Sequence, residues 1–224
     1  MANPELYVVT TCMGRLDHLK RTLETLVAQD CKLVVVDYSC PENCGSWVVN
    51  NHGSRVHVVR VLDQKYFNVS KAKNAGAKYV KIIGTDIDWI FFLDCDMPVS
   101  SSFVDEVKRG INKNNYFMVQ YNPGLLGVSV KDWGRAEWFD EGIDGYGYED
   151  IQLILKLDVL GLKISLLPEK LISPIPYGAE LQTRYLQEKS KAASMDKNAA
   201  YLMKKLGDFA DRAHSQGENF RGFA

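Results

Sequence analysis

An apolar run that ends in two closely spaced acids constrains the fold of this chain most strongly. Residues 89–93 are apolar, and Asp94-Cys95-Asp96 follows them directly. Side chains two positions apart in a strand point the same way, so Asp94 and Asp96 would share one direction. Open α/β sheets bind ligands at the carboxyl ends of their strands, where paired acids are costly unless a cation is bound. We therefore predict a divalent metal that carries a phosphate, with a solvated turn as the alternative.

Strand and helix patterns alternate through the first two-thirds of the chain. Short apolar runs at residues 6–10, 33–36 and 56–61 are separated by segments with helical spacing. This alternation predicts an α/β fold with a mainly parallel central sheet flanked by helices. We expect one domain over residues 1–178, followed by a helical tail over residues 179–224 that packs on the core.

The charge balance of the chain limits the classes of binding partner that we expect. The 224 residues carry 27 basic and 28 acidic side chains, a formal net charge of −1, which argues against a nucleic-acid partner. The sequence opens without a charged-then-apolar leader, and its apolar runs are too short to span a bilayer. We therefore expect no transmembrane segment and a cytoplasmic location.

Five cysteines are scattered along the chain: Cys12, Cys31, Cys40, Cys44 and Cys95. The Cys40 and Cys44 pair invites a zinc interpretation, but no second cysteine or histidine pair stands at ligand spacing. We expect reduced thiols, with a disulfide between Cys40 and Cys44 as the alternative.

Further polar residues are predicted near the same sheet edge. Asp37 ends the second strand, and Arg15 lies in the turn after the first, where it could bind a phosphate or ribose. The alternatives are a turn or cap residue for Asp37 and an exposed surface arginine for Arg15. Lys73 and Asn74 lie on a helix whose small residues, such as Gly76, would let it press onto the sheet near the mouth of the site.

Residues 124–148 are rich in glycine and aromatic residues, which predicts a long irregular functional loop. Its end places Tyr146 and Tyr148, which offer flat surfaces to sugar rings, before Glu149 and Asp150 at the start of a helix. A carboxylate here could serve as a general base that takes a proton from a hydroxyl. The alternative is an ordinary helix N-terminus with acids in its first turn.

Five segments, in this order, resemble a glycosyltransferase of the GT-A fold in the inverting family-two group. The branch most similar is the chondroitin-polymerase-like and β1,4-galactosyltransferase-like one. The segments are Val8-Val9-Thr10-Thr11-Cys12-Met13-Gly14-Arg15, Val34-Val35-Val36-Asp37, Lys73-Asn74-Ala75-Gly76, Phe92-Leu93-Asp94-Cys95-Asp96-Met97 and residues 138–150. Lysine stands at position 73 where the family usually has arginine.

The resemblance implies transfer of a hexose or N-acetylhexosamine from a nucleotide sugar, most often a UDP-sugar, to a glycan or other hydroxyl acceptor. Residues 1–99 would form the donor half and residues 100–178 the acceptor half. The implied donor-binding residues are Thr10, Thr11, Arg15, Asp37, Lys73, Asn74 and Asp94. Asp94 and Asp96 would hold Mn²⁺ or Mg²⁺, and Asp150 would be the catalytic base, assisted by Glu149. The implied acceptor-binding residues are Trp133, Tyr146, Tyr148 and Glu149.

One feature departs from the family pattern. A histidine after the last core strand usually completes the metal site, but residues 171–178 contain none. His214 from the tail, a water or a backbone carbonyl could take its place, or metal binding could be weak. The same segment could instead form a lid, since Gly178 and polar residues follow it.

Two rival functions remain. A nucleotidyltransferase should carry a glycine-rich basic loop after its first strand, but Thr11-Cys12-Met13-Gly14-Arg15 has one glycine and one arginine. A non-catalytic nucleotide-sugar-binding or scaffold subunit is the rival from another class. The sequence leaves the sugar, the acceptor and the oligomeric state open.

Overall fold

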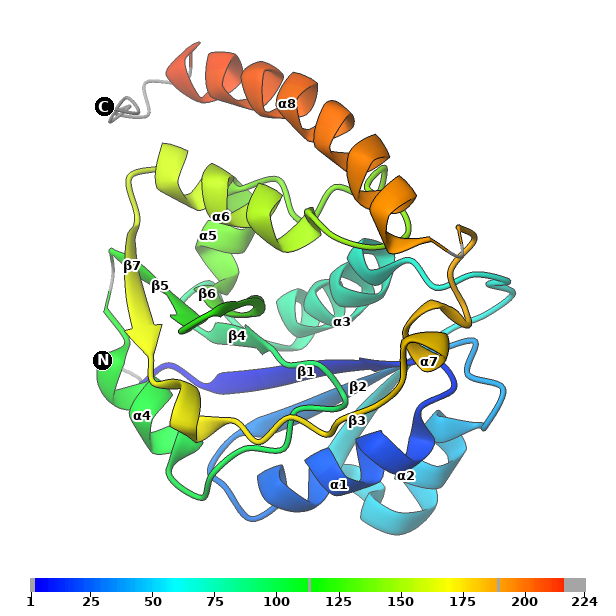
Figure 1. Cartoon of the computed structure of the whole chain (residues 1–224). Helices are drawn as coiled ribbons and strands as arrows, with labels where there is room; N and C mark the ends of the chain where they lie inside the picture. Colours follow the sequence, from blue (N-terminus) through cyan, green and yellow to red (C-terminus); the bar gives the residue numbers. More distant parts are fainter. Residues whose placement is uncertain (1–2, 113, 189, 216–224) are drawn as a thin grey trace.

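A computed structural model describes residues 3–112, 114–188 and 190–215, and these form a seven-stranded mixed sheet covered by helices on both faces (Figure 1). The strand order is β3-β2-β1-β4-β6-β5-β7. The strands are β1 (Leu6–Cys12), β2 (Lys32–Tyr38), β3 (Val56–Val61), β4 (Trp89–Phe92), β5 (Asn115–Val119), β6 (Asn122–Ser129) and β7 (Lys163–Leu167). Only β6 among these runs against its neighbours, so the prediction of a mainly parallel α/β sheet is confirmed.

Helices pack on both faces of this sheet. One face is covered by α1 (Leu16–Leu26), α2 (Cys44–His52) and α4 (Phe103–Gly110). The other is covered by α3 (Val69–Ile83), α5 (Val130–Arg135) and α6 (Glu149–Val159). Two short 3₁₀ turns cover Gly53–Arg55 and Glu169–Leu171.

Strands β1 and β2 are almost entirely apolar because helices cover both faces of the sheet at these strands. In β1, Leu6 and Val8 pack into the core on the α1 side, while Tyr7 and Val9 pack into the core on the α3 side. Strands buried on both faces are typical of parallel sheets covered by helices. The register pairs Cys12 with Asp37, so β1 and β2 end together at one edge of the sheet.

The chain after Leu167 returns over the sheet edge and then forms a further layer outside one of the two helical layers. The short helix α7 (Ala179–Thr183) lies near the carboxyl end of β1, and α8 (Lys191–Ser215) crosses outside α6 (Figure 1). Phe209 and Ala213 of α8 pack against Val159 at the end of α6. None of the described helices has the length and apolar character needed to cross a membrane.

The prediction of one irregular segment over residues 124–148 is wrong in its first half, where β6 and α5 lie. The sequence does not predict strand β6, because Pro123, Gly124 and Gly127 have low strand propensity. Gly127 is needed because a β-carbon there would lie 2.8 Å from Phe91 Cδ2 and 3.2 Å from Phe117 Cβ. Packing against these two aromatic rings therefore outweighs the low strand propensity of glycine.

Close contact between α3 and the sheet depends on Gly76, as the sequence predicted. A β-carbon at this position would collide with Val9 and lie 2.9 Å from Val36 Cγ2. We expect Gly76→Ala to lower the free energy of unfolding by about 1–3 kcal/mol, the usual cost of overpacking a core. Urea unfolding followed by circular dichroism measures this change.

Gly207→Ala in α8 is the matched control, because nothing lies within 4 Å of its β-carbon position. There alanine should leave stability unchanged or raise it by up to about 1 kcal/mol. Equal effects at the two positions would contradict the close packing of α3 on β1 and β2.

Candidate active site

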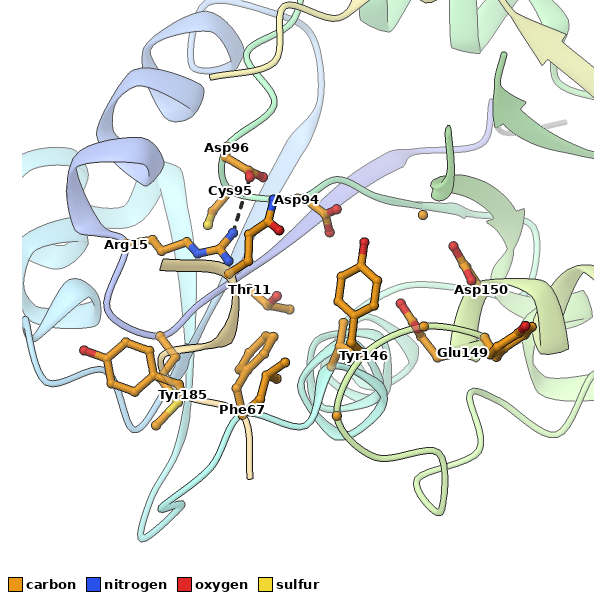
Figure 2. A pocket seen from close by; sticks show the side chains of 18 of the residues that line it. Thr11, Arg15, Phe67, Asp94, Cys95, Asp96, Tyr146, Glu149, Asp150 and Tyr185 are labelled. Carbon is orange, nitrogen blue, oxygen red and sulfur yellow. Dashed lines mark hydrogen bonds and ion pairs between the residues drawn. The ribbon is translucent and has the colours of Figure 1, made fainter. Parts of the chain in front are cut away.

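A cavity of about 430 Å³ opens where β1 and β4 end (Figure 2). Its lining includes the turn after β1, the segment after β4, the start of β6, and the approach to α6. The returning chain from Tyr177 to Leu186 covers one side. The volume is typical of small-ligand pockets, and the position is the edge at which open α/β sheets bind ligands.

Asp94 and Asp96 enter this cavity from the segment after β4, as predicted. The Asp96 side chain is 2% exposed and accepts a hydrogen bond from Arg15 Nη1 at 3.3 Å. Arg15 also donates to Tyr177 Oη at 3.1 Å, and its guanidinium lies 4.4 Å from the centre of that ring. In this structure Arg15 therefore neutralises Asp96 and ties it to the returning chain.

Lys73 lies behind the cavity, with a side chain that is only 3% exposed. Its Nζ is 4.0 Å from Asp94 Oδ1 and 3.7 Å from Glu149 Oε1, and it donates to the Gly124 carbonyl at 3.3 Å. Burial opposes the charge, but the surrounding carboxylates outweigh it and raise the pKa of Lys73. Lys73 therefore acts as a buried cation shared by two acids from different elements, rather than as a lining residue.

Glu149 and Asp150 begin α6 on the far side of the cavity from Arg15 (Figure 2). The preceding turn places Gly145, Gly147 and Tyr148 at φ values of +80°, +88° and +77°, a region that favours glycine. Burial raises the pKa of Glu149 to about 7, despite the opposing effect of Lys73. A carboxyl that titrates near neutrality is suited to exchanging protons with a ligand.

Gly124 lies between the two acidic pairs. A β-carbon on it would be 3.7 Å from Asp150 Oδ2 and 3.7 Å from Asp94 Oδ2. The absence of a side chain there leaves both carboxylates open to the same space. Asp150 is thus close enough to the strand-end acids to act on the same ligand.

The strand-end acids suit a hard divalent cation. Carboxylate oxygens are the ligands that Mn²⁺ and Mg²⁺ prefer. Among the described residues, no third carboxylate or histidine joins Asp94 and Asp96 at metal-binding distance; the one cluster of that kind is formed by cysteines. The residues therefore fit a metal whose remaining ligands come from a phosphate-bearing ligand and water.

Two predicted site residues lie elsewhere. Trp133 is fully buried in the core beneath α6 and stacks on Trp138 with ring centres 5.5 Å apart, so the prediction that it binds an acceptor is wrong. His214 is exposed in the last turn of α8. Met195 of the same helix lines the cavity, and His214 lies about 28 Å further along the helix, which excludes it as a ligand.

Three other predicted residues do not line the cavity. Asp37 accepts hydrogen bonds from the backbone N–H groups of Cys40 and Gly45, at 2.9 and 3.1 Å, which is the cap role weighed as the alternative. Asn74 exchanges two hydrogen bonds with the backbone of Phe139 and fixes the chain that leads to α6. Thr10 is buried with its hydroxyl unpaired, whereas Thr11 points the other way and lines the cavity.

The sequence missed the aromatic residues of the returning chain, although it suggested a lid near Gly178. Tyr177, Leu181 and Tyr185 all line the cavity. The Tyr185 ring occupies the space that a β-carbon on Gly14 would need, and its backbone carbonyl accepts from Phe67 N at 2.7 Å. The sequence signal that could have identified this part of the lining is the pair Tyr177 and Tyr185 beside Gly178.

Comparison with known families finds one match. The model described as "Glycosyl transferase family 2" matches residues 7–166 of this chain. A comparison with curated proteins finds no match to the sequence.

Solved structures share the fold at 13% sequence identity. TarS from S. aureus (residues 1–349) has a TM-score of 0.61, with 88% of this chain and 70% of that one covered. GalNAc-T7 with UDP, GalNAc and Mn²⁺ has a TM-score of 0.57, with 73% and 42% covered. A Drosophila β1,4-galactosyltransferase 7 mutant with manganese, UDP-Gal and xylobiose also has a TM-score of 0.57, with 85% and 79% covered. The fold is therefore similar to that of GT-A glycosyltransferases.

Removing the buried cation should destabilise the protein strongly. Lys73→Met leaves Asp94 and Glu149 without their shared partner, and breaking a buried pair in this way costs about 3–5 kcal/mol. Lys78→Met is the control, because Lys78 pairs with Glu141 at 3.2 Å on the surface and should contribute less than about 1 kcal/mol. Chemical denaturation of both variants at pH 7 tests the difference, and similar losses would contradict the role of Lys73.

The pKa of Glu149 predicts a pH-dependent stability. Its folded value of about 7 exceeds the ordinary 4.5, so the folded state holds the proton that the unfolded state releases. The stabilisation is complete below pH 4.5 and is lost as the pH rises to about 7. In EDTA, the stability of wild type relative to Glu149→Gln should fall over this window by on the order of 3 kcal/mol or less. Parallel stability curves for the two proteins would rule out the raised pKa.

Proposed function

The chain belongs to glycosyl transferase family 2, and on that premise we propose that it is an inverting enzyme with a UDP-sugar donor. It transfers the sugar to an acceptor hydroxyl with the help of a divalent metal. Residues 1–99 form the donor half of its catalytic domain and residues 100–178 the acceptor half. The described residues after 178, up to Ser215, form a tail on the core, and residues 216–224 of the predicted tail lie outside the described residues.

One observation carries this proposal. Two acidic pairs from different halves of the chain, Asp94 with Asp96 and Glu149 with Asp150, line the same cavity. The first pair suits a metal–diphosphate group, and the second suits proton transfer. Sugar transfer needs both functions within reach of one anomeric carbon.

On the donor side, Asp94 and Asp96 would hold Mn²⁺ or Mg²⁺ against the diphosphate. Such a metal supplies Lewis-acid stabilisation of the charge that builds on the departing diphosphate. Arg15 already lies beside Asp96 and lines the cavity, so it can turn to a phosphate oxygen when Asp96 takes other ligands. Two of the similar structures contain manganese, one with UDP and the other with UDP-Gal, which supports this choice of donor and metal.

On the acceptor side, Asp150 would take the proton of the attacking hydroxyl. The hydroxyl oxygen then bonds to the anomeric carbon while the bond from that carbon to the diphosphate breaks. A single displacement of this kind turns an α-linked donor into a β-linked product. Tyr146 and Tyr148 line the same side and offer aromatic faces for an acceptor sugar, with Glu149 positioning its hydroxyls.

A non-catalytic nucleotide-sugar-binding subunit is the second candidate. It is favoured by the ion pair between Arg15 and Asp96, which occupies one proposed metal ligand, and by the lack of a third protein ligand among the described residues. Such a subunit would bind the donor but would not need Asp150.

Asp150→Asn separates the two candidates. The amide keeps the shape of the side chain but does not take up the proton, so turnover of a UDP-sugar should fall by about 10²–10⁴-fold, the usual contribution of a general base. Donor affinity should stay within a few-fold of wild type, because Asp150 contacts the acceptor.

Asp158→Asn is the matched control. It makes the same change on the same helix, where Asp158 accepts a hydrogen bond from Tyr116 and does not line the cavity. This variant should keep near-normal turnover. Equal turnover in wild type and Asp150→Asn would instead favour the binding subunit.

A further inference from the structure

Three cysteines that are far apart in the sequence meet inside the protein. Cys12 ends β1, Cys40 lies in the loop after β2, and Cys44 is the first residue of α2. Their sulfur atoms all lie within 4.8 Å of one another, and Cys12 Sγ is 4.0 Å from Cys40 Sγ. The parallel pairing of β1 with β2 creates this cluster, because the two strands end side by side.

These distances suit a shared metal better than a disulfide. Zinc–sulfur bonds are about 2.3 Å long, so two sulfurs of a tetrahedral site lie about 3.8 Å apart. The observed spacing is therefore close to that of a thiolate site. A disulfide would require two sulfurs to approach to about 2 Å, which is a much larger movement.

The surroundings favour a thiolate at Cys40. The backbone N–H of Gly14 donates to Cys40 Sγ at 3.2 Å, and the cluster lies at the N-terminus of α2, where a helix favours negative charge. Hydrogen bonds from the backbone to ligating groups are the usual support of metal sites. The thiolate, rather than the thiol, is the form that binds metals.

Cys95 belongs to the same buried core cluster as these three cysteines. All four are at most 6% exposed. Cys95 also lines the cavity, between Asp94 and Asp96 (Figure 2).

We propose that Cys12, Cys40 and Cys44 form a buried site for a thiophilic d¹⁰ cation of the Zn²⁺ class. The site is chemically distinct from the carboxylates of Asp94 and Asp96, because soft thiolates select zinc-like ions and hard oxygens select Mn²⁺ or Mg²⁺. Its loading fixes the turn that carries Gly14 and Arg15 against the end of β2. The proposal does not depend on the enzymatic activity.

Titration of the reduced full-length protein with Cd²⁺ tests the site directly. Wild type should bind one Cd²⁺ per chain with the ultraviolet absorption of sulfur-to-cadmium charge transfer, and one Zn²⁺ should displace it. Cys40→Ser should weaken binding by on the order of 100-fold or more, because losing even an outer hydrogen bond costs 10–100-fold. Circular dichroism of the variant checks that it is folded.

Two controls separate this site from other thiols and from the carboxylates. Cys31→Ser should bind Cd²⁺ like wild type, because Cys31 lies outside the cluster. Asp96→Ala should also retain the charge-transfer band. Absence of the charge-transfer band in reduced wild type would overturn the proposal by itself. An unchanged band in folded Cys40→Ser would also overturn it. A thiol count that shows Cys12 and Cys40 joined as a disulfide in the protein purified without reductant would also overturn it.

Discussion

The buried ammonium of Lys73 is the interaction on which the candidate active site depends. It lies between Asp94, which follows β4, and Glu149, which begins α6, and it also bonds to the Gly124 carbonyl at the start of β6. These three elements come from separate parts of the chain. Without this cation, the mutual repulsion of the carboxylates would oppose the fold that brings them together. Charge balance at one buried atom thus links stability to the geometry of the cavity.

A second ion pair, between Arg15 and Asp96, holds the returning chain against the strand-end acids in this structure. Arg15 joins Asp96 to Tyr177, so the returning chain and the strand-end acid share one cation. A metal on Asp96 would compete with Arg15 for the carboxylate. The proposed function therefore implies that ligand binding at Asp96 is coupled to the position of the chain from Tyr177 to Leu186, which covers one side of the cavity.

Local patterns in the sequence predicted the parts of the site that stand at the ends of regular elements. The apolar run before Asp94 placed the strand-end acids, and the glycines before Glu149 placed the start of α6. Contacts between distant segments were not predictable in this way. The sequence gives no sign of α5 and therefore places Trp133 in an irregular loop, whereas its side chain packs in the core. Cys12 was not linked to Cys40 because only the pairing of β1 with β2 brings them together.

Calorimetric titration of UDP tests the central claim, that the cavity binds a nucleotide diphosphate through a metal held by the strand-end acids. The titration is run with Mn²⁺, with EDTA, and with an Asp96→Ala variant in Mn²⁺. The account predicts micromolar binding to wild type in Mn²⁺ and a loss of that binding in both EDTA and the variant. Tight binding that is indifferent to the metal and to Asp96 would contradict the metal role, and no binding in Mn²⁺ would contradict the donor site itself.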